Sequence, residues 1–156
     1  MSQYRIELLG KQDRKTFASG SPELDAYLQT RASQDMRRRV ASCFVAVSGA
    51  GAVAGFYTLA ATSVLLDLLS ADHARRLPRY PAVPAILLGR LAIDAAHQGK
   101  RLGSALVADA LIRASRSEVM AYAMVVDAKD EAAAQFYQHL GFERLGEDRR
   151  RLIRAL

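Results

Sequence analysis

Residues 88–106 read LGRLAIDAAHQGKRLGSAL, which indicates a buried strand, a short turn rich in glycine and cations, and the first turns of an amphipathic helix. The first N–H groups of a helix have no partner within the helix, and the helix dipole favours negative charge at that end. A strand that enters a helix through such a turn therefore predicts an anion-binding site. A second informative segment, QFYQHLGF at residues 135–142, follows about one strand and one helix later.

Size and composition favour a single globular domain spanning residues 1–156, since 51% of the residues are hydrophobic and 24% are charged. The only cysteine, Cys43, lies in an apolar segment, so we expect it in the core of a cytoplasmic protein that forms no disulfide within the chain. The three histidines show no metal-ligand spacing, and we expect no metal. No apolar run approaches the roughly 20 residues that span a bilayer, and no signal peptide opens the chain, so we expect no membrane association.

The charge pattern is strongly basic, with a net charge of +6 and 18 arginines among the 22 basic residues. Arginine binds phosphate groups bidentately, whereas lysine acts as a point charge. The arginines cluster at 37–39, 75–79 and 149–154. These clusters indicate either a solvated basic surface or a surface for a polyanionic partner.

The remaining pattern predicts a mixed α/β chain. Strands are expected at 4–9, 42–47, 53–59, 85–93 and 122–126, with a closing hairpin formed by 142–145 and 151–153; helices are expected from Pro22 behind an N-cap at Ser21, and at 31–39, 72–76, 102–115 and 130–140. Pro78, Pro81 and Pro84 are expected to break regular structure and to hold the following segment extended. The strand at 85–93 should be covered on both faces because it is apolar throughout.

This order of elements, with both motif regions, resembles the GNAT acetyltransferase superfamily over nearly the whole chain. The resemblance implies a single-domain α/β fold with a mixed, mostly antiparallel sheet flanked by helices. The superfamily's pyrophosphate loop has the pattern Gln/Arg-x-x-Gly-x-Gly/Ala, and here the corresponding residues are Gln98-Gly99-Lys100-Arg101-Leu102-Gly103. Arg101 therefore replaces a glycine that lets the backbone approach phosphate closely. If Arg101 keeps a helical conformation, its N–H still points at the ligand and its side chain adds a cationic contact.

More narrowly, the chain resembles the TacT-like acetyltransferase toxins of bacterial type II toxin–antitoxin modules. The residues that carry this resemblance are Phe17-x-Ser19-Gly20, Glu23-Leu24-Asp25-x-Tyr27-Leu28, Pro78-Arg79-Tyr80-Pro81-x-Val83-Pro84, Leu88-Gly89-Arg90-Leu91-Ala92 and Phe136-Tyr137-x-x-Leu140-Gly141-Phe142. The resemblance implies transfer of acetyl from acetyl-CoA to the α-amine of aminoacyl-tRNA, which blocks translation. It also implies neutralisation by a ribbon-helix-helix antitoxin and assembly as a homodimer.

Acetyl-CoA is expected to lie along the strand and turn of residues 88–106. The backbone of Leu91, Ala92 and Ile93 would pair with the pantetheine arm as an added strand, and one of these N–H groups would polarise the thioester carbonyl. The diphosphate is expected at Gln98, Gly99, Lys100, Arg101, Leu102, Gly103 and Ser104. Asp94 is expected to cap or order the turn. The alternative is an ordinary turn that happens to be basic.

Tyr137 is the expected general acid. In a helix over 130–140, Ala132, Phe136 and Leu140 would share the buried stripe, and Tyr137 would lie about 100° away, facing a cleft. A phenol with a pKa near 10 can protonate a departing thiolate whose thiol titrates at about 8.5. The alternative is a tyrosine at the edge of the core whose hydroxyl is already hydrogen-bonded.

The acceptor is expected to be an α-amine, because no His or Glu is evidently placed as a general base. A lysine amine, with a pKa of about 10.4, would need one, whereas an α-amine at about 7.7–8.0 is already partly neutral. The acceptor side is expected to include Arg37, Arg38, Arg79, Tyr80 and Arg90, although Arg90 could equally pair with a buried carboxylate. Two alternatives stay open: a GNAT enzyme acting on a protein N-terminus or small amine, and an inactive GNAT fold that serves as a binding partner.

Overall fold

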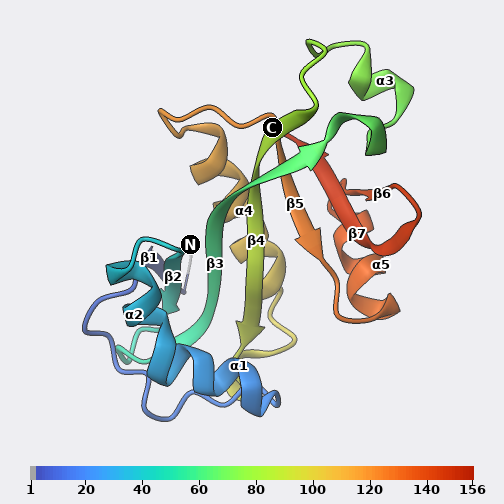
Figure 1. Cartoon of the computed structure of the whole chain (residues 1–156). Coiled ribbons are helices and arrows are strands. Elements are labelled where there is room, and N and C mark those ends of the chain that lie inside the picture. The colour runs from blue at the N-terminus through green and yellow to red at the C-terminus, as the bar shows by residue number, and fades with distance from the viewer. Residues whose placement is uncertain (1–2) are drawn as a thin grey trace. The chain divides into compact units, whose positions relative to one another are not determined.

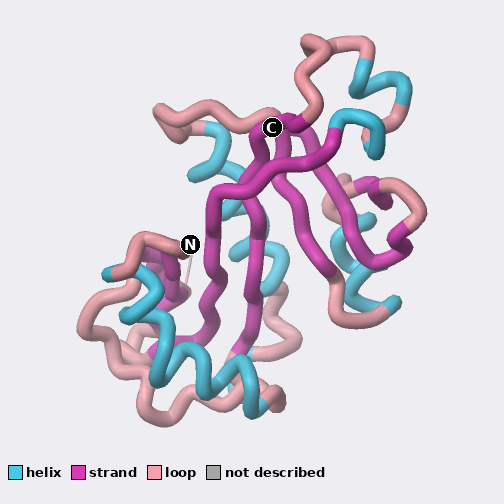
Figure 2. The backbone as a smooth tube through the Cα atoms, in the orientation of Figure 1, coloured by secondary structure: helices cyan, strands magenta, loops and turns pink. Residues whose placement is uncertain are grey.

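The computed structural model describes residues 3–156 of the chain. Its strands are β1 (Arg5–Leu8), β2 (Ser42–Val47), β3 (Val53–Leu65), β4 (Ala82–Ile93), β5 (Ala123–Asp127), β6 (Glu143–Leu145) and β7 (Asp148–Ala155) (Figures 1 and 2). Its helices are α1 (Pro22–Ala26), α2 (Ala32–Arg37), α3 (Ala71–Ala74), α4 (Leu102–Ser115) and α5 (Glu131–His139), with a π-helical turn at Tyr27–Arg31 and 3-10 turns at Leu66–Leu68 and Ala95–His97.

The described strands form one seven-stranded sheet in the order β1-β2-β3-β4-β5-β7-β6. The pair β4–β5 is parallel, whereas β1–β2, β2–β3, β5–β7 and β6–β7 are antiparallel. This confirms the expected α/β fold with a mixed, mostly antiparallel sheet. The chain divides into two compact units, one of which runs up to Ala60 and includes Gly89–Ala110, while the other comprises Ala61–Leu88 and Leu111–Leu156.

In the first unit, the helical segment after Ser21 begins as expected. Pro22 occupies the first turn of α1, and the Ser21 hydroxyl accepts a hydrogen bond from the N–H of Leu24. The predicted break before a second helix is wrong, because α1 and α2 continue through a π-helical turn in which the N–H of Ala32 bonds to the carbonyl of Tyr27. The extra residue of a π turn rotates the helix face, and Tyr27, Leu28 and Ala32 are all buried. Their core also contains Cys43, with 0% exposure, as expected.

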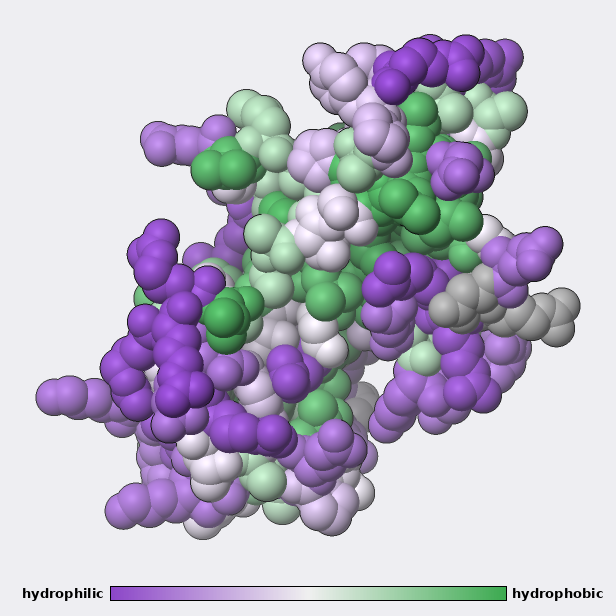
Figure 3. Space-filling model, viewed as in Figure 1, coloured by the Kyte–Doolittle hydropathy of each residue, from purple (hydrophilic) through white to green (hydrophobic). Residues whose placement is uncertain are grey.

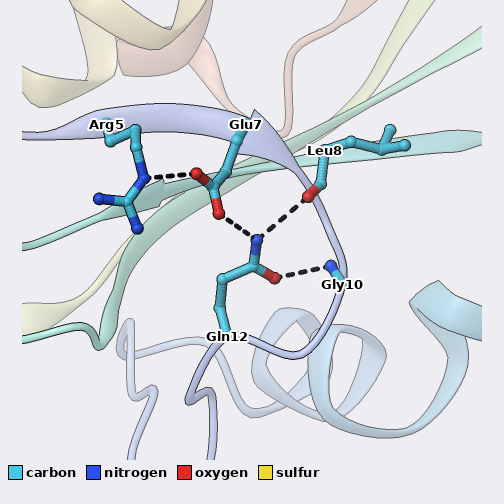
Figure 4. A network of polar contacts seen from close by, with 5 residues as sticks. All are labelled: Arg5, Glu7, Leu8, Gly10 and Gln12. Atoms are coloured by element: carbon cyan, nitrogen blue, oxygen red, sulfur yellow. Dashed lines mark hydrogen bonds and ion pairs between the residues drawn. The ribbon is translucent and has the colours of Figure 1, made fainter.

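The turn after β1 is closed by the side chain of Gln12 (Figure 4). Its amide nitrogen donates to Glu7 Oε2 at 2.5 Å and to the Leu8 carbonyl at 3.1 Å, and its Oε1 accepts from the N–H of Gly10 at 2.6 Å. Arg5 Nε donates to the other oxygen of Glu7. These hydrogen bonds, first from Gln12 and then from Arg5, lower the pKa of Glu7. The contribution of Glu7 to the turn is therefore present at neutral pH and is lost as the pH falls through this lowered pKa.

In the second unit, α5 turns a different face to the core from the one expected. Asp130 caps the helix by accepting from the N–H of Ala133 at 2.8 Å. The expected buried stripe of Ala132, Phe136 and Leu140 is wrong, since Ala132 is exposed and the other two are half-buried. Ala134 and Tyr137 are the buried residues, because the ring of Tyr137 packs edge-on against Phe142 at 5.6 Å. Tyr137 thus anchors α5 in the core.

Strand β4 is longer and less covered than expected. It begins at Ala82 and includes Pro84, whose carbonyl accepts from the N–H of Tyr122 at 2.9 Å. Pro84 is exposed. A strand tolerates proline there because proline lacks the N–H donor but keeps the carbonyl acceptor. Along the strand Val83, Ala85, Leu88 and Ala92 are buried. The alternation of these residues with exposed or half-buried ones shows that the expectation of two covered faces is wrong.

No helix among residues 3–156 is both long enough and apolar enough to cross a bilayer.

Figure 3 shows hydrophobic surface, in green, beside the α3 segment and surrounded by hydrophilic side chains in purple.

Candidate active site

The turn that leads from β4 into α4 contains two left-handed residues. Gly99 has φ +77° and Arg101 has φ +61°. The left-handed region suits glycine, whereas a side chain with a Cβ costs about 1–2 kcal/mol there. The expectation that Arg101 could keep a right-handed helical conformation is therefore wrong. Arg101 instead has a backbone conformation that favours glycine, and it adopts this conformation at the cost of local strain.

The N-terminus of α4 has the charge pattern of an anion site. The helix begins at Leu102, which is 3% exposed and anchors the first turn in the core, and that turn contains no acidic residue. Lys100 and Arg101 are exposed directly before it, and Gly103 and Ser104 are half-buried. Orphan helical N–H groups, the helix dipole and two cations directly before the helix suit a diphosphate.

The side chain of Gln98 has a role that its motif does not predict. Its amide nitrogen donates to the carbonyls of Ser19 and Ile93, both at 3.1 Å. The side chain therefore braces the turn through its amide nitrogen. Ser19 lies 79 residues away in the sequence, so local spacing gave no signal for this contact.

Asp94 ties the same turn to the segment before α1, which confirms and extends its expected role. One carboxylate oxygen accepts from the N–H of Ala96 at 3.0 Å and caps the 3-10 turn, and the other accepts from the N–H of Ala18 at 2.9 Å. The N–H of Ala95 donates in return to the Ala18 carbonyl at 2.8 Å. We call Asp94, Gln98, Ala18 and Ser19 the loop clamp.

The end of β4 is placed to pair with an extended ligand. The parallel register of β4 with β5 runs from Ala85 to Leu88, so Leu91, Ala92 and Ile93 lie beyond it. Ala92 is buried in the core of the first unit, and Leu91 and Ile93 are half-buried. Strand backbone that continues past its neighbour offers N–H and C=O groups for β-augmentation.

Tyr137 lies in the second unit, with 6% of its surface exposed. Burial raises the pKa of its phenol to about 12, so the hydroxyl is protonated at neutral pH. Among the described residues the hydroxyl has no hydrogen-bond partner, yet no fully buried side-chain nitrogen or oxygen there is left unpaired. The ring is thus packed in the core, and the phenol carries its proton at neutral pH.

The expected acceptor-side residues fall into three places. Arg37 and Arg38 are exposed at the end of α2, in the first unit. Arg79 and Tyr80, which is 66% exposed, line a pocket of about 560 Å³ beside α3, in the second unit. Arg90 lies on β4 in the first unit, where its guanidinium stacks on the ring of Tyr27 instead of pairing with a carboxylate.

Within residues 3–156 no group of three or more His, Cys, Asp or Glu side chains is arranged to hold a metal ion.

Comparison with known proteins places these features in a family. The acetyltransferase (GNAT) domain profile matches residues 39–144. A tRNA-acetylating toxin of Mycobacterium tuberculosis is 39% identical over 133 residues, which is 84% of this chain and 78% of that protein. AtaT complexed with acetyl-methionyl-tRNAfMet is 29% identical with a TM-score of 0.89, covering 97% of this chain and 94% of AtaT.

A Tyr-to-Phe variant of AtaT, bound to the C-terminus of the antitoxin AtaR and acetyl-CoA, is 26% identical with a TM-score of 0.80, covering 99% of this chain and 94% of that one. The profile match covers most of the chain, and it falls on β4, the left-handed turn, α4 and α5. The chain described above therefore belongs to the GNAT acetyltransferase family.

Proposed function

We propose that this chain is an acetyl-CoA-dependent N-acetyltransferase toxin that acetylates the α-amine of aminoacyl-tRNA and so blocks translation. The observation that carries the proposal is the 39% identity, over 84% of the chain, to a tRNA-acetylating toxin. The basic turn before α4 and the net charge of +6 support it, because both substrates are polyanions. Residues 1–156 act in this proposal as one catalytic domain.

Acetyl-CoA supplies the activated acetyl group in this reaction. The backbone of Leu91, Ala92 and Ile93 holds its pantetheine arm, and an N–H of this segment polarises the thioester carbonyl. The turn holds its diphosphate through the backbone of Gln98, Gly99, Leu102, Gly103 and Ser104 and through the charges of Lys100 and Arg101. The exposed side chains of Arg37, Arg38, Arg79 and Tyr80 contribute to binding of the acceptor.

In the proposed reaction one covalent bond forms while another breaks, and a proton is transferred at each end. A C–N bond forms to the acceptor amine, the C–S bond breaks, the nitrogen loses a proton and the sulfur gains one. Tyr137 donates its hydroxyl proton to the departing sulfur and recovers a proton that the nitrogen releases. Burial raises the pKa of Tyr137 to about 12, so the hydroxyl carries the proton to be donated at neutral pH.

Partners and location follow from the same proposal. AtaT, which this chain resembles, is seen with the C-terminus of its antitoxin and acetyl-CoA. We expect a cognate antitoxin of the ribbon-helix-helix type, a homodimeric toxin and action in the cytoplasm, where charged tRNA is found.

The decisive experiment measures transfer of labelled acetyl from acetyl-CoA to a bulk pool of charged tRNA. Label is expected on charged tRNA and absent from uncharged tRNA and from charged tRNA whose α-amine was blocked chemically beforehand. Label on protein N-termini or small amines, with none on charged tRNA, would instead support the non-toxin acetyltransferase. No thermal stabilisation by CoA would support the inactive binding partner, since a ligand of the folded state raises stability.

Arg101→Gly is expected to change stability and ligand affinity in opposite directions. Glycine relieves the left-handed strain at this position but loosens the unfolded chain, so the free energy of unfolding should rise by about 0.5–1 kcal/mol. Loss of the guanidinium should weaken acetyl-CoA binding about fivefold, as expected for one partly exposed charge contact. Denaturant unfolding and calorimetric titration measure the two effects.

Arg39→Gly is the matched control, because Arg39 has φ +62° at the end of α2, away from the turn. It should give a similar gain in stability with unchanged acetyl-CoA affinity. If Arg101→Gly bound acetyl-CoA as tightly as the parent chain, the proposed contact of its side chain with the diphosphate would be wrong.

A further inference from the structure

Arg90 is held on an aromatic platform. Its Cζ lies 3.7 Å from the centroid of the Tyr27 ring, well within the range of a cation–π contact. Tyr27 is 2% exposed, its ring stacks against Phe56 with an interplanar angle of 16°, and its hydroxyl donates to Asp35 Oδ2 at 2.8 Å. Both the ring and its hydroxyl are therefore fixed, and the plane of the Arg90 guanidinium is oriented before any ligand binds.

The N–H edge of this guanidinium has no partner among the residues that the structure describes. An arginine carries five N–H donors, yet no described residue accepts a hydrogen bond or forms an ion pair with Arg90. By contrast, Arg144 pairs with Glu131 at 2.5 Å and Arg151 with Asp127 at 2.7 Å. Asp35 is engaged by the Tyr27 hydroxyl. Because Arg90 is only half-buried, these N–H donors are accessible to a ligand, and an anion can accept charge-assisted hydrogen bonds from them.

The position of Arg90 points to the acceptor. It directly precedes Leu91, the first residue of the strand segment proposed to hold pantetheine, and it lies against Tyr27 of the π turn. Arg31, in the π turn, places its Cζ 5.5 Å from the same Tyr27 ring. An aminoacyl ester has no free carboxylate, so the anion nearest to the reacting amine is the phosphodiester of the terminal nucleotide.

We propose that Arg90 binds a phosphodiester at the 3′ end of the acceptor tRNA, with Tyr27 as the positioning residue that orients its guanidinium. This inference rests on the proposed function and names an acceptor contact within it. Planar, bidentate recognition of phosphate requires arginine, and the stack removes the freedom that a flexible side chain otherwise loses on binding.

The test measures binding of an uncharged RNA hairpin that carries a tRNA acceptor stem and its single-stranded 3′ end, in the presence of CoA, as a function of salt. Arg90→Gln is expected to weaken binding about tenfold and to reduce the slope of log affinity against log salt by about one. Arg90→Lys should recover the slope but only part of the affinity. Tyr27→Phe, which keeps the ring, should bind nearly as the parent, whereas Tyr27→Leu should resemble Arg90→Lys.

Arg116→Gln is the matched control, since Arg116 is exposed beyond the end of α4 and has no part in the proposed site. Thermal unfolding confirms that each variant is folded. Binding of the hairpin by Arg90→Gln with the parent's affinity and salt slope would overturn the proposal, as would failure of the parent chain to bind it.

The outcome is separable from that of the proposed function. Dependence of hairpin binding on Arg90, without acetylation of charged tRNA, would support the phosphate contact and reject the proposed reaction. Acetylation of charged tRNA, together with unchanged hairpin binding by Arg90→Gln, would support the proposed reaction and reject the phosphate contact.

Discussion

Tyr137→Phe is expected to lower the rate of acetyl transfer about 10²–10⁴-fold, the usual contribution of a positioned general acid. The change removes one oxygen and leaves the ring that packs against Phe142, so the fold and the acetyl-CoA affinity should persist. Single-turnover transfer of labelled acetyl measures the chemical step, and calorimetry measures the affinity.

Tyr122→Phe is the matched control in the same unit. Its hydroxyl is hydrogen-bonded to His73 Nδ1 at 2.5 Å, and it has no role in the proposed chemistry. It should transfer acetyl at the parent's rate. An unimpaired Tyr137→Phe variant would remove Tyr137 from the mechanism.

The pH dependence of transfer distinguishes the two participating groups. The rate should rise with pH through the pKa of the acceptor amine, at or below about 7.7–8.0, because only the neutral amine attacks. Burial raises the pKa of Tyr137 to about 12, so loss of its proton should cause no fall in rate below roughly pH 11. The stability that this raised pKa contributes is complete below about pH 10 and is lost as the pH rises through 12. A fall in rate at pH 9 that persists in Tyr137→Phe would come from another group.

Asp94→Ala is expected to lower the free energy of unfolding by about 2–3 kcal/mol and to raise KM for acetyl-CoA more than it lowers kcat. The carboxylate accepts from two backbone N–H groups, those of Ala18 and Ala96, and each hydrogen bond to a charged group contributes about 1.5–3 kcal/mol before its partial exposure is discounted. Without the loop clamp, the turn that holds the diphosphate must be ordered when the ligand binds.

Two variants define this effect. Asp94→Asn keeps one acceptor oxygen and should recover about half of the lost stability. Asp13→Ala removes a single exposed acceptor, which the N–H of Lys15 occupies at 3.1 Å, and should change both quantities little. Equal losses in Asp94→Ala and Asp13→Ala would show that Asp94 does not hold the turn.

Much of the fold was predictable because it depends on neighbouring residues. Helix α4 occupies Leu102–Ser115, the range that its apolar spacing predicts. The caps at Ser21 and Asp130 are hydrogen bonds between residues three apart, and Ser and Asp are residue types that favour the N-cap position. The π turn was missed because its cause is packing of the rotated helix face against the core, which no local pattern reports.

The residues of the candidate site also divide into those that local sequence identifies and those whose contacts only the tertiary structure shows. Lys100, Arg101 and the helix start at Leu102 were identifiable as an anion-binding turn, because a turn and the helix that follows it are contiguous in the chain. The clamp between Asp94 and Ala18 joins residues 76 apart, and the Arg90 stack joins two different elements. Neither contact can be predicted from the spacing of residues in the sequence.

The sequence by itself determined the family, the order of elements and the basic turn before α4, because each rests on short-range patterns. Only the tertiary structure decided that Arg101 is left-handed, that Tyr137 rather than Phe136 anchors α5, and that the side chain of Gln98 braces the turn. Backbone conformation at a closed turn, the buried face of a helix and the partner of a side-chain amide are all set by what packs against them. Those neighbours come from distant parts of the chain, and they meet only when the sheet has formed.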